Sequence, residues 1–156
     1  PTDTGGILHD RLAEVAPKAL AQAIAKLQDG TAPRMPQDES LVTYHPKLAR
    51  EDGRIDWTRP ADAIERLIRA FDPWPGTTTL IEGKVLKVLP PAEAIMDGTS
   101  GEPGTILSVD GDSFAVACGE GTLRIWEIQM EGRKRMAVRA FLAGNDGRIR
   151  TGLRLG

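Results

Sequence analysis

The middle of the chain has the apolar spacing of an amphipathic helix. Four residues recur at positions i, i+3, i+4 and i+7 of one segment: Ile64, Leu67, Ile68 and Phe71. This spacing aligns them on one helical face. Pro60 suits the helix start because it has no N–H to leave unpaired, and Pro73 pushes Asp72 out of the helical region. We therefore expect a helix over residues 61–71.

Downstream of this helix, short apolar runs alternate with turn residues. The runs predict five strands, near residues 77–81, 84–94, 104–109, 113–118 and 122–130. Asp110-Gly111 is a good hairpin signal, and Gly119-Glu120-Gly121 is a weaker one. We also expect a short helix near residues 138–142 and a terminal strand over residues 152–156.

The last of the five runs changes its apolar parity. Leu123 and Ile125 alternate with polar residues, whereas Trp126 and Ile128 continue the apolar pattern on the opposite parity. Such a change is typical of a strand that bulges or turns a barrel corner. Five short strands with one packed helix favour an α+β, mainly β fold, in which the strands form a small antiparallel barrel.

The first part of the chain predicts a separate helical segment. Residues 4–28 contain apolar residues at helical spacing, Asp3 or Thr4 would cap the start, and Asp29-Gly30 would end the helix. Pro17 interrupts the pattern, so two short helices and one kinked helix are both open interpretations.

A polar segment separates this helix from the barrel. Residues 29–59 contain three prolines and show no sustained periodicity, which is typical of a linker or a surface arm. Its carboxylate pairs, such as Asp38-Glu39 and Glu51-Asp52, are expected to be solvated charges.

Composition describes a soluble globular chain of one core. Of the 156 residues, 40% are hydrophobic and 27% are charged, and no apolar run approaches the ~20 residues of a membrane span. The net charge of −2 is unevenly distributed. Residues 124–156 hold eight basic and three acidic side chains, so they carry +5 and the preceding residues carry −7. A basic end on an acidic body is compatible with a polyanionic partner.

Few side chains suggest chemistry. His9 and His45 are far apart and stand in no metal-ligand spacing, and the chain contains no nucleophile elbow, P-loop or dinucleotide-binding motif. Cys118 is the single cysteine and ends an apolar run, so we expect a buried strand thiol in a reducing compartment, the cytoplasm. We predict no metal site and no catalytic residue in this chain.

Five short motifs occur in a fixed order along the chain. They are Arg54-Ile55-Asp56-Trp57, Phe71-Asp72-Pro73-Trp74-Pro75-Gly76, Pro103-Gly104-Thr105-Ile106-Leu107, Gly119-Glu120-Gly121-Thr122-Leu123 and Gly132-Arg133-Lys134-Arg135-Met136. Their order and spacing resemble the C-terminal domain of the methionyl-tRNA formyltransferase family. The resemblance covers nearly the whole chain and implies an OB-like Greek-key β-barrel with a packed helix, preceded by a helical segment and an extended linker.

The resemblance also implies a domain organisation. Residues 1–30 would be the helical end of the N-terminal catalytic domain, residues 31–59 the linker, and residues 60–156 the C-terminal barrel. The family's catalytic asparagine and histidine have no counterpart here, and Asp3 is better interpreted as a helix cap than as the catalytic acid. The chain alone is therefore expected to be inactive and to hold no cofactor.

In the full enzyme, the resemblance implies transfer of a formyl group from 10-formyltetrahydrofolate to the methionine of initiator methionyl-tRNA. The partners of this part would be that tRNA and the N-terminal catalytic domain, with no membrane, and the protein would be a monomer. Six basic residues are the candidates for contact with tRNA: Lys47, Arg50 and Arg54 in the linker, and Arg133, Lys134 and Arg135 in the downstream loop. Arginine adds a fork that matches phosphate.

Other interpretations remain open at this stage. A similar barrel follows the catalytic domain in sugar and folate formyltransferases and in formyltetrahydrofolate hydrolases, and a free-standing interaction module is a third possibility. Trp57 and Trp74 would be base-stacking residues on one interpretation. We expect instead that both pack in the interior, at the corner between helix and strand.

Overall fold

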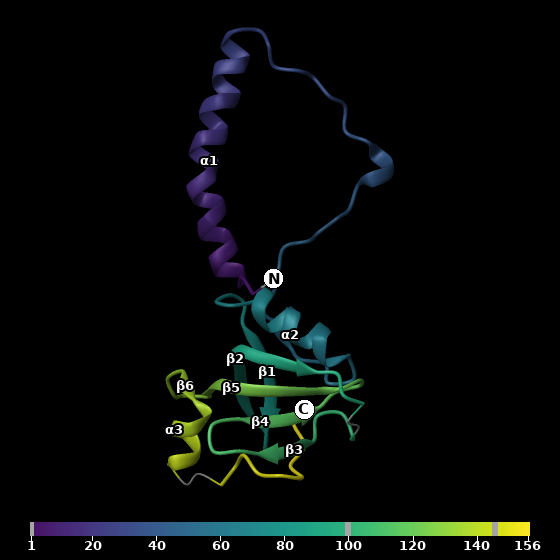
Figure 1. Ribbon diagram of the computed structural model, residues 1–156, viewed down its shortest axis with the longest axis vertical. Helices are drawn as coiled ribbons and strands as arrows, with labels where there is room; N and C mark the ends of the chain where they lie inside the picture. Colours follow the sequence, from purple (N-terminus) through teal and green to yellow (C-terminus); the bar gives the residue numbers. More distant parts are fainter. Residues whose placement is uncertain (1, 99–100, 145–146) are drawn as a thin grey trace.

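The computed structural model describes residues 2–98, 101–144 and 147–156. Figure 1 shows a long helix and an extended returning segment that project from a sheet-containing body. The base of the long helix is attached to that body by hydrogen bonds. The Gly6 N–H donates to the Asp72 carbonyl at 2.8 Å, and Arg69 Nη1 donates to the Asp3 carbonyl at 3.1 Å.

The projecting helix, α1 (Gly5–Gln28), is continuous through Pro17, which favours a single helix over two short ones. Thr4 caps it, because its hydroxyl oxygen accepts the Ile7 N–H at 3.3 Å. Its apolar side chains are between 46% and 69% exposed: Ile7, Leu8, Leu12, Val15, Leu20, Ile24 and Leu27. Among the described residues, no helix is long and apolar enough to cross a membrane.

An extended segment returns from the end of α1 to the sheet. It contains two single-turn 3-10 helices, η1 (Glu39–Leu41) and η2 (Glu51–Gly53). From Ile55 onward the backbone is held by the sheet, since the Ile55 N–H donates to the Thr78 carbonyl at 2.8 Å. The end of the segment predicted as a linker therefore packs on the body of the protein.

The next helix, α2 (Ala61–Ala70), confirms the amphipathic pattern. Its buried residues are Ala61, Ile64 and Ile68. Two ion pairs of i,i+4 spacing lie on the rest of its surface: Arg66 with Asp62 at 2.8 Å, and Arg69 with Glu65 at 2.5 Å. The apolar face thus turns toward the sheet. The Arg66–Asp62 pair is exposed, whereas the Arg69–Glu65 pair is partly buried.

Within the described residues, six strands form one antiparallel sheet. Five of them occupy the predicted runs: β1 (Thr77–Ile81), β2 (Lys84–Ile95), β3 (Ile106–Val109), β4 (Phe114–Ala117) and β5 (Thr122–Met130). The sixth, β6 (Met136–Ala137), was not predicted, and α3 (Val138–Ala143) follows it where a short helix was expected.

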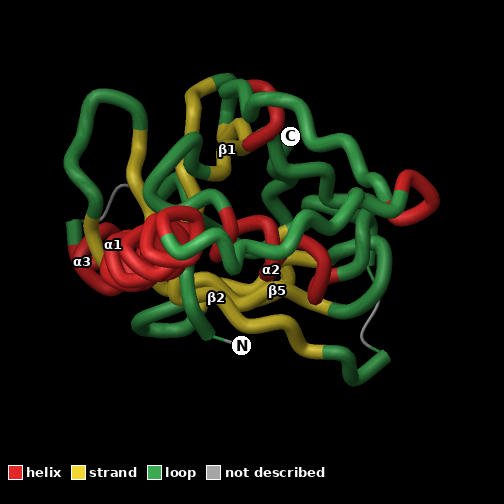
Figure 2. Tube along the Cα trace, turned by 90° about the horizontal axis from the view of Figure 1, so that it is seen from above, coloured by secondary structure: helices red, strands yellow, loops and turns green. Residues whose placement is uncertain are grey.

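The strand order is β1-β2-β5-β4-β3, and β6 pairs with Glu127 and Ile128 of β5. All the described strand pairs are antiparallel. Viewed down the long axis, α2 lies alongside β2 and β5 (Figure 2). Its apolar face joins a core that includes Leu86, Phe114 and Ile128, so the sheet and α2 enclose one interior.

The pairing of β2 with β5 contains a bulge. Leu89 pairs with Glu127 and Ala92 pairs with Ile125, so β2 has one more residue than β5 between these points. The extra residue lies in Pro90-Pro91, where proline is tolerated because a bulge does not need its N–H. The parity change in the sequence of β5 falls at Trp126, which lies opposite this bulge. The extra residue belongs to β2, not to β5.

The C-terminal segment differs from expectation. Residues 152–156 do not form a strand but make a single bridge between Arg154 and Thr105. The Leu155 N–H donates to the Gly104 carbonyl at 2.8 Å, and the Gly156 N–H donates to the Leu80 carbonyl at 3.0 Å. The segment therefore contacts two separate parts of the sheet and lacks the continuous partner that a ladder requires.

The two tryptophans of the helix–strand corner have opposite environments. Trp57 is 5% exposed, and its indole N–H donates to the Thr79 hydroxyl at 3.0 Å. Trp74 is 57% exposed, so the expectation that it packs in the interior was wrong. The sequence shows an aromatic residue between two prolines at this corner, but it does not show that the corner turns the ring outward.

Replacing Trp57 should destabilise the protein far more than replacing Trp74. Trp57→Ala removes a buried ring and leaves Thr79 without its partner, so we expect the free energy of unfolding to fall by roughly 3–5 kcal/mol. Trp74→Ala removes an exposed ring and should change it by less than about 1 kcal/mol. Urea denaturation of the two variants is the measurement, and equal losses would contradict the assignment.

Cys118 confirms the prediction of a buried thiol. It directly follows β4, is 3% exposed, and its Sγ donates to the Val116 carbonyl at 3.7 Å. Burial raises the pKa of the Cys118 thiol to about 12 because the interior disfavours a thiolate.

The stability of the fold should therefore fall as pH rises above 9. The unfolded chain loses the Cys118 proton near the ordinary pKa of 9.0, whereas the folded chain keeps it to about 12. Between these values the folded state binds more protons, so each pH unit lowers the free energy of unfolding by at most about 1.4 kcal/mol. Urea denaturation between about pH 8 and about pH 10.5 should show this slope, and Cys118→Ala should reduce it. Equal slopes in both proteins would refute the assignment.

Candidate nucleic-acid interface

The downstream basic loop connects β5 to β6 in a tight hairpin. Its backbone turns at Gly132, whose φ is 73°, a value that favours glycine. The Arg133 N–H donates to the Met130 carbonyl at 3.0 Å, and the Gln129 side-chain amide donates to the Arg133 carbonyl at 2.8 Å. These bonds hold the loop backbone while the side chains of Arg133, Lys134 and Arg135 remain exposed.

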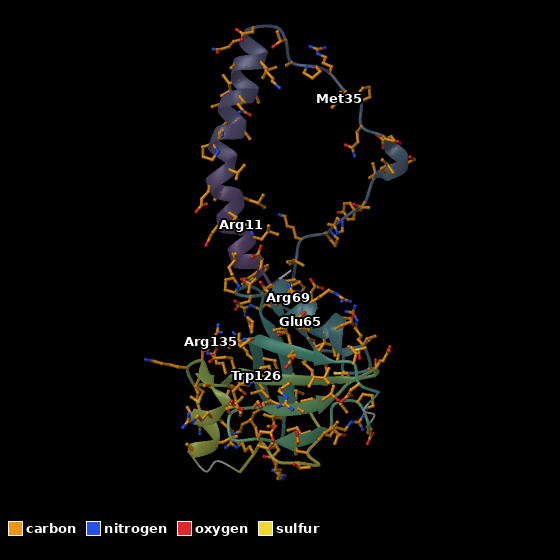
Figure 3. All side chains as sticks on the ribbon, viewed as in Figure 1. Arg11, Met35, Glu65, Arg69, Trp126 and Arg135 are labelled. Atoms are coloured by element: carbon orange, nitrogen blue, oxygen red, sulfur yellow. The ribbon has the colours of Figure 1, made fainter. Side chains whose placement is uncertain are left out.

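Arg135 is bound on several sides by its own protein (Figure 3). Its Nε donates to Glu127 Oε2 at 2.9 Å, and its Nη2 donates to the Pro90 carbonyl at 2.7 Å. A third guanidinium nitrogen lies 3.8 Å from Asp72 Oδ1. Arg135 thus joins the basic loop to β5, to the bulge of β2 and to the corner after α2.

Arg133 and Lys134 have different surroundings. The Arg133 guanidinium lies over the Phe141 ring, 5.8 Å from its centre, which is within the range of a cation–π contact. Lys134 makes no ion pair with any described residue. Of the three loop cations, Lys134 therefore has the side chain least engaged within the protein.

Of the upstream cations, Arg50 and Arg54 lie against the body. Lys47 is exposed in the extended segment. Arg50 and Arg54 line a hollow of about 300 Å³ together with Thr78 and Val85. A second hollow, of about 310 Å³, also contains Val85 and continues to Lys87 and Gly132.

Val85 lines both hollows, so it links Arg50 and Arg54 to Lys87 and to the Gly132 turn that precedes Arg133 and Lys134. We call this surface the basic strip and define it as Arg50, Arg54, Lys87, Arg133 and Lys134. Lys87 was not among the predicted residues. The sequence could have indicated Lys87 through the alternation within β2. Leu86 and Val88 are buried, and Lys87 between them faces outward.

Acidic residues interrupt the basic strip. Glu51 lines the first hollow and Glu131 lines the second. The Glu131 carboxylate accepts the Val85 N–H at 3.3 Å, so that acidic side chain is bound to the backbone at the start of β2. The strip therefore carries acidic as well as basic side chains around the start of β2.

No metal centre appears among the described residues. No three of their His, Cys, Asp and Glu side chains are placed to hold a metal ion. His9 contacts only its neighbour Asp10, at 3.2 Å between Nδ1 and Oδ1, and His45 is exposed in the extended segment.

Comparisons with known proteins agree with this picture. Methionyl-tRNA formyltransferase of Akkermansia muciniphila is 43% identical over 148 residues, covering 92% of this chain and 47% of that protein. The enzyme of the same name from Pseudomonas fluorescens is 46% identical over 154 residues, covering 99% of this chain and 47% of that protein. The chain thus spans about half the length of the curated relatives it matches.

Solved structures extend the likeness of fold. A variant of HypX from Aquifex aeolicus matches with a TM-score of 0.63 at 20% identity, covering 92% of this chain and 26% of that one. The family model described as the formyl transferase C-terminal domain matches residues 47–146, which include the whole body from η2 to α3. The chain therefore belongs to the formyl transferase C-terminal domain family.

Proposed function

We propose that this chain is the tRNA-holding part of a methionyl-tRNA formyltransferase. The full enzyme would transfer a formyl group from 10-formyltetrahydrofolate to the methionine of initiator methionyl-tRNA. The observation that supports this most is the basic strip. Its two hollows share Val85 and hold Arg50, Arg54 and Lys87 beside the turn of the basic loop, in a chain whose relatives bear the enzyme's name. The relatives favour this enzyme over a sugar or folate formyltransferase and over a free-standing module.

We interpret the body as an OB-like Greek-key barrel. The strands β3, β4 and β5 follow one another as antiparallel neighbours, and β2 lies on the far side of β5. This order, in which the strand before three consecutive strands lies beside the last of them, is that of a Greek key. OB-like barrels bind oligonucleotides on strand and loop surfaces, which is compatible with the position of the basic strip around the start of β2.

The chain would divide as the family resemblance implied. Residues 1–30 would be the end of a catalytic domain, residues 31–59 the linker, and residues 60–156 the tRNA-holding barrel. The exposed apolar side chains of α1 support this division, because such a row on a single helix indicates a surface that packs against further protein. The enzyme would act in the cytoplasm as a monomer, on initiator methionyl-tRNA.

The contribution of this part to the reaction would be to position the tRNA. The family's catalytic asparagine and histidine have no counterpart in this chain, so chemistry and folate binding would belong to the other half. HypX, which has this fold, has been solved in complex with tetrahydrofolic acid. Holding a large substrate in register makes the reaction with a second bound reactant effectively unimolecular.

The six predicted cations would not contribute equally. Lys47, Arg50, Arg54, Arg133 and Lys134 would contact phosphates, and Lys87 would join them. Arg135 would act mainly as a positioning residue, because its guanidinium already binds Glu127 and the Pro90 carbonyl. Phosphate contacts fix position without reading sequence, so the barrel would hold initiator and elongator tRNAs about equally.

The experiment that tests the proposal measures tRNA binding by this chain as a function of salt. A strip making three to five phosphate contacts should give a log–log slope of roughly −3 to −5. Arg133→Ala with Lys134→Ala should reduce the magnitude of the slope by about one to two. Lys26→Ala, on exposed α1, is the control and should leave the slope unchanged. Absence of tRNA binding, or a strong preference for initiator tRNA, would contradict the proposal.

Replacing Arg135 should change the stability of the fold more than it changes the number of phosphate contacts with tRNA. Arg135→Ala removes the bonds to Glu127 and Pro90 and should lower the free energy of unfolding by about 1–2 kcal/mol. Arg135→Lys should not restore this loss because lysine lacks the planar fork. Lys134→Ala should stay within about 0.5 kcal/mol. Urea denaturation and tRNA binding of the three variants are the measurements. A stable Arg135→Ala protein with a reduced salt slope would make Arg135 a phosphate ligand instead.

A further inference from the structure

A separate hollow lies beside the basic loop and is not part of the basic strip. Its volume is about 480 Å³. It is formed where β2, β5, β6 and α3 meet the turn before β4, and its lining residues are Pro91, Asp112, Trp126, Glu127, Ala137 and Arg139. Glu127 connects it to the basic loop, since the same carboxylate accepts Arg135 Nε at 2.9 Å.

Trp126 forms the aromatic part of this hollow. It stands between the paired residues Ile125 and Glu127, opposite the bulge of β2, and therefore has no cross-strand partner in the ladder. Ile125 and Ile128 on the same strand are fully buried, whereas Trp126 is only half-buried. No described residue accepts a hydrogen bond from its indole N–H. A large ring in a central strand thus keeps part of its surface and its donor available.

Two charged side chains complete the hollow. Arg139, in α3, and Asp112, in the turn before β4, both line it. Neither forms an ion pair with a described residue. Glu127, in contrast, is already bound by Arg135. The hollow therefore offers a ring surface, one cation and one carboxylate without partners in the described part of the chain.

These groups match an unpaired nucleobase. Aromatic side chains stack on bases that are not held in a duplex, and the polar edges of such bases are then open to hydrogen bonding. A carboxylate can accept from the N–H groups of a base, and guanine presents an imino and an amino donor side by side. An arginine at the rim can bind the attached phosphate.

We propose that the hollow binds one unpaired nucleobase of RNA, stacked on Trp126, with Asp112 accepting from its N–H edge and Arg139 at its phosphate. The proposal rests on the proposed function, since it takes RNA as the ligand. Residues 124–156 carry a charge of +5, which favours a polyanion over a neutral ring compound. The bases next to the phosphates held by Arg133 and Lys134 would be within reach of the hollow.

The test compares Trp126→Ala, Trp126→Phe and Trp74→Ala in binding to a uridine hexamer and to the same hexamer with one guanosine. Loss of one stacking contact should weaken binding roughly 5- to 150-fold and leave the salt slope unchanged. Trp126→Phe should retain most of the affinity. Trp74→Ala is the matched control, an exposed tryptophan outside the hollow, and should bind as the unmodified chain does.

Two further variants test the polar groups. Asp112→Asn should remove the preference for the guanosine-containing hexamer with little effect on the uridine hexamer. Arg139→Ala should reduce the magnitude of the salt slope by about one. In a Trp74→Phe background, RNA should quench the fluorescence of Trp126, because the other tryptophan, Trp57, is buried. This direct signal does not depend on the folding of a Trp126 variant.

Each outcome has a defined meaning. Unchanged affinity of a folded Trp126→Ala protein, or absence of quenching on RNA binding, overturns the nucleobase site. The proposed function then still stands on the salt slope set by Arg133 and Lys134. If the unmodified chain binds neither tRNA nor the hexamers, both the nucleobase site and the proposed function fail.

Discussion

The pairing of β2 with β5 is the constraint on which the rest of the structure depends. These two long strands are the centre of the sheet, and α2 packs on both of them. Their ladder is interrupted at Pro90-Pro91, where β2 has one residue more than β5. The bulge bends the pair and turns Trp126 outward from the buried row of β5. The bulge thus shapes the interior and also leaves the hollow beside β6.

Arg135 links this bulge to the loop that bears the candidate phosphate contacts. Its guanidinium bonds the Pro90 carbonyl and Glu127 and lies near Asp72. A carbonyl at a bulge has no ladder partner, and a charged donor is a strong replacement. One side chain therefore fixes the position of its neighbours Arg133 and Lys134. The basic triplet thus contains one residue, Arg135, that is bound within the fold, beside Lys134, which makes no ion pair with a described residue.

The body of the protein and its projecting arm follow different physical rules. The body has a continuous core and close strand pairing, and its fold is shared with HypX at only 20% identity. The arm consists of α1, which has no buried residue, and an extended return. An isolated helix gains little from propensity alone and is stabilised in proteins mainly by packing. The arm therefore suggests contact with further protein, while the body is stable by its own interior.

The sequence by itself determined α2 and the strands β1 to β5 of the body, because their signals are local. The i, i+3, i+4, i+7 row predicted α2, and alternation and turn residues predicted β1 to β5. The parity change at Trp126 predicted a bulge or a barrel corner in β5, and the structure places the extra residue in β2, opposite Trp126. Tertiary structure alone decided what depends on distant neighbours. It buried Trp57 and exposed Trp74, bound Arg135 to Glu127 and Pro90, and placed Lys87 in the hollow that reaches the turn of the basic loop. Local spacing fixes which face a side chain occupies, but its burial and its partners are set by segments far away in the chain.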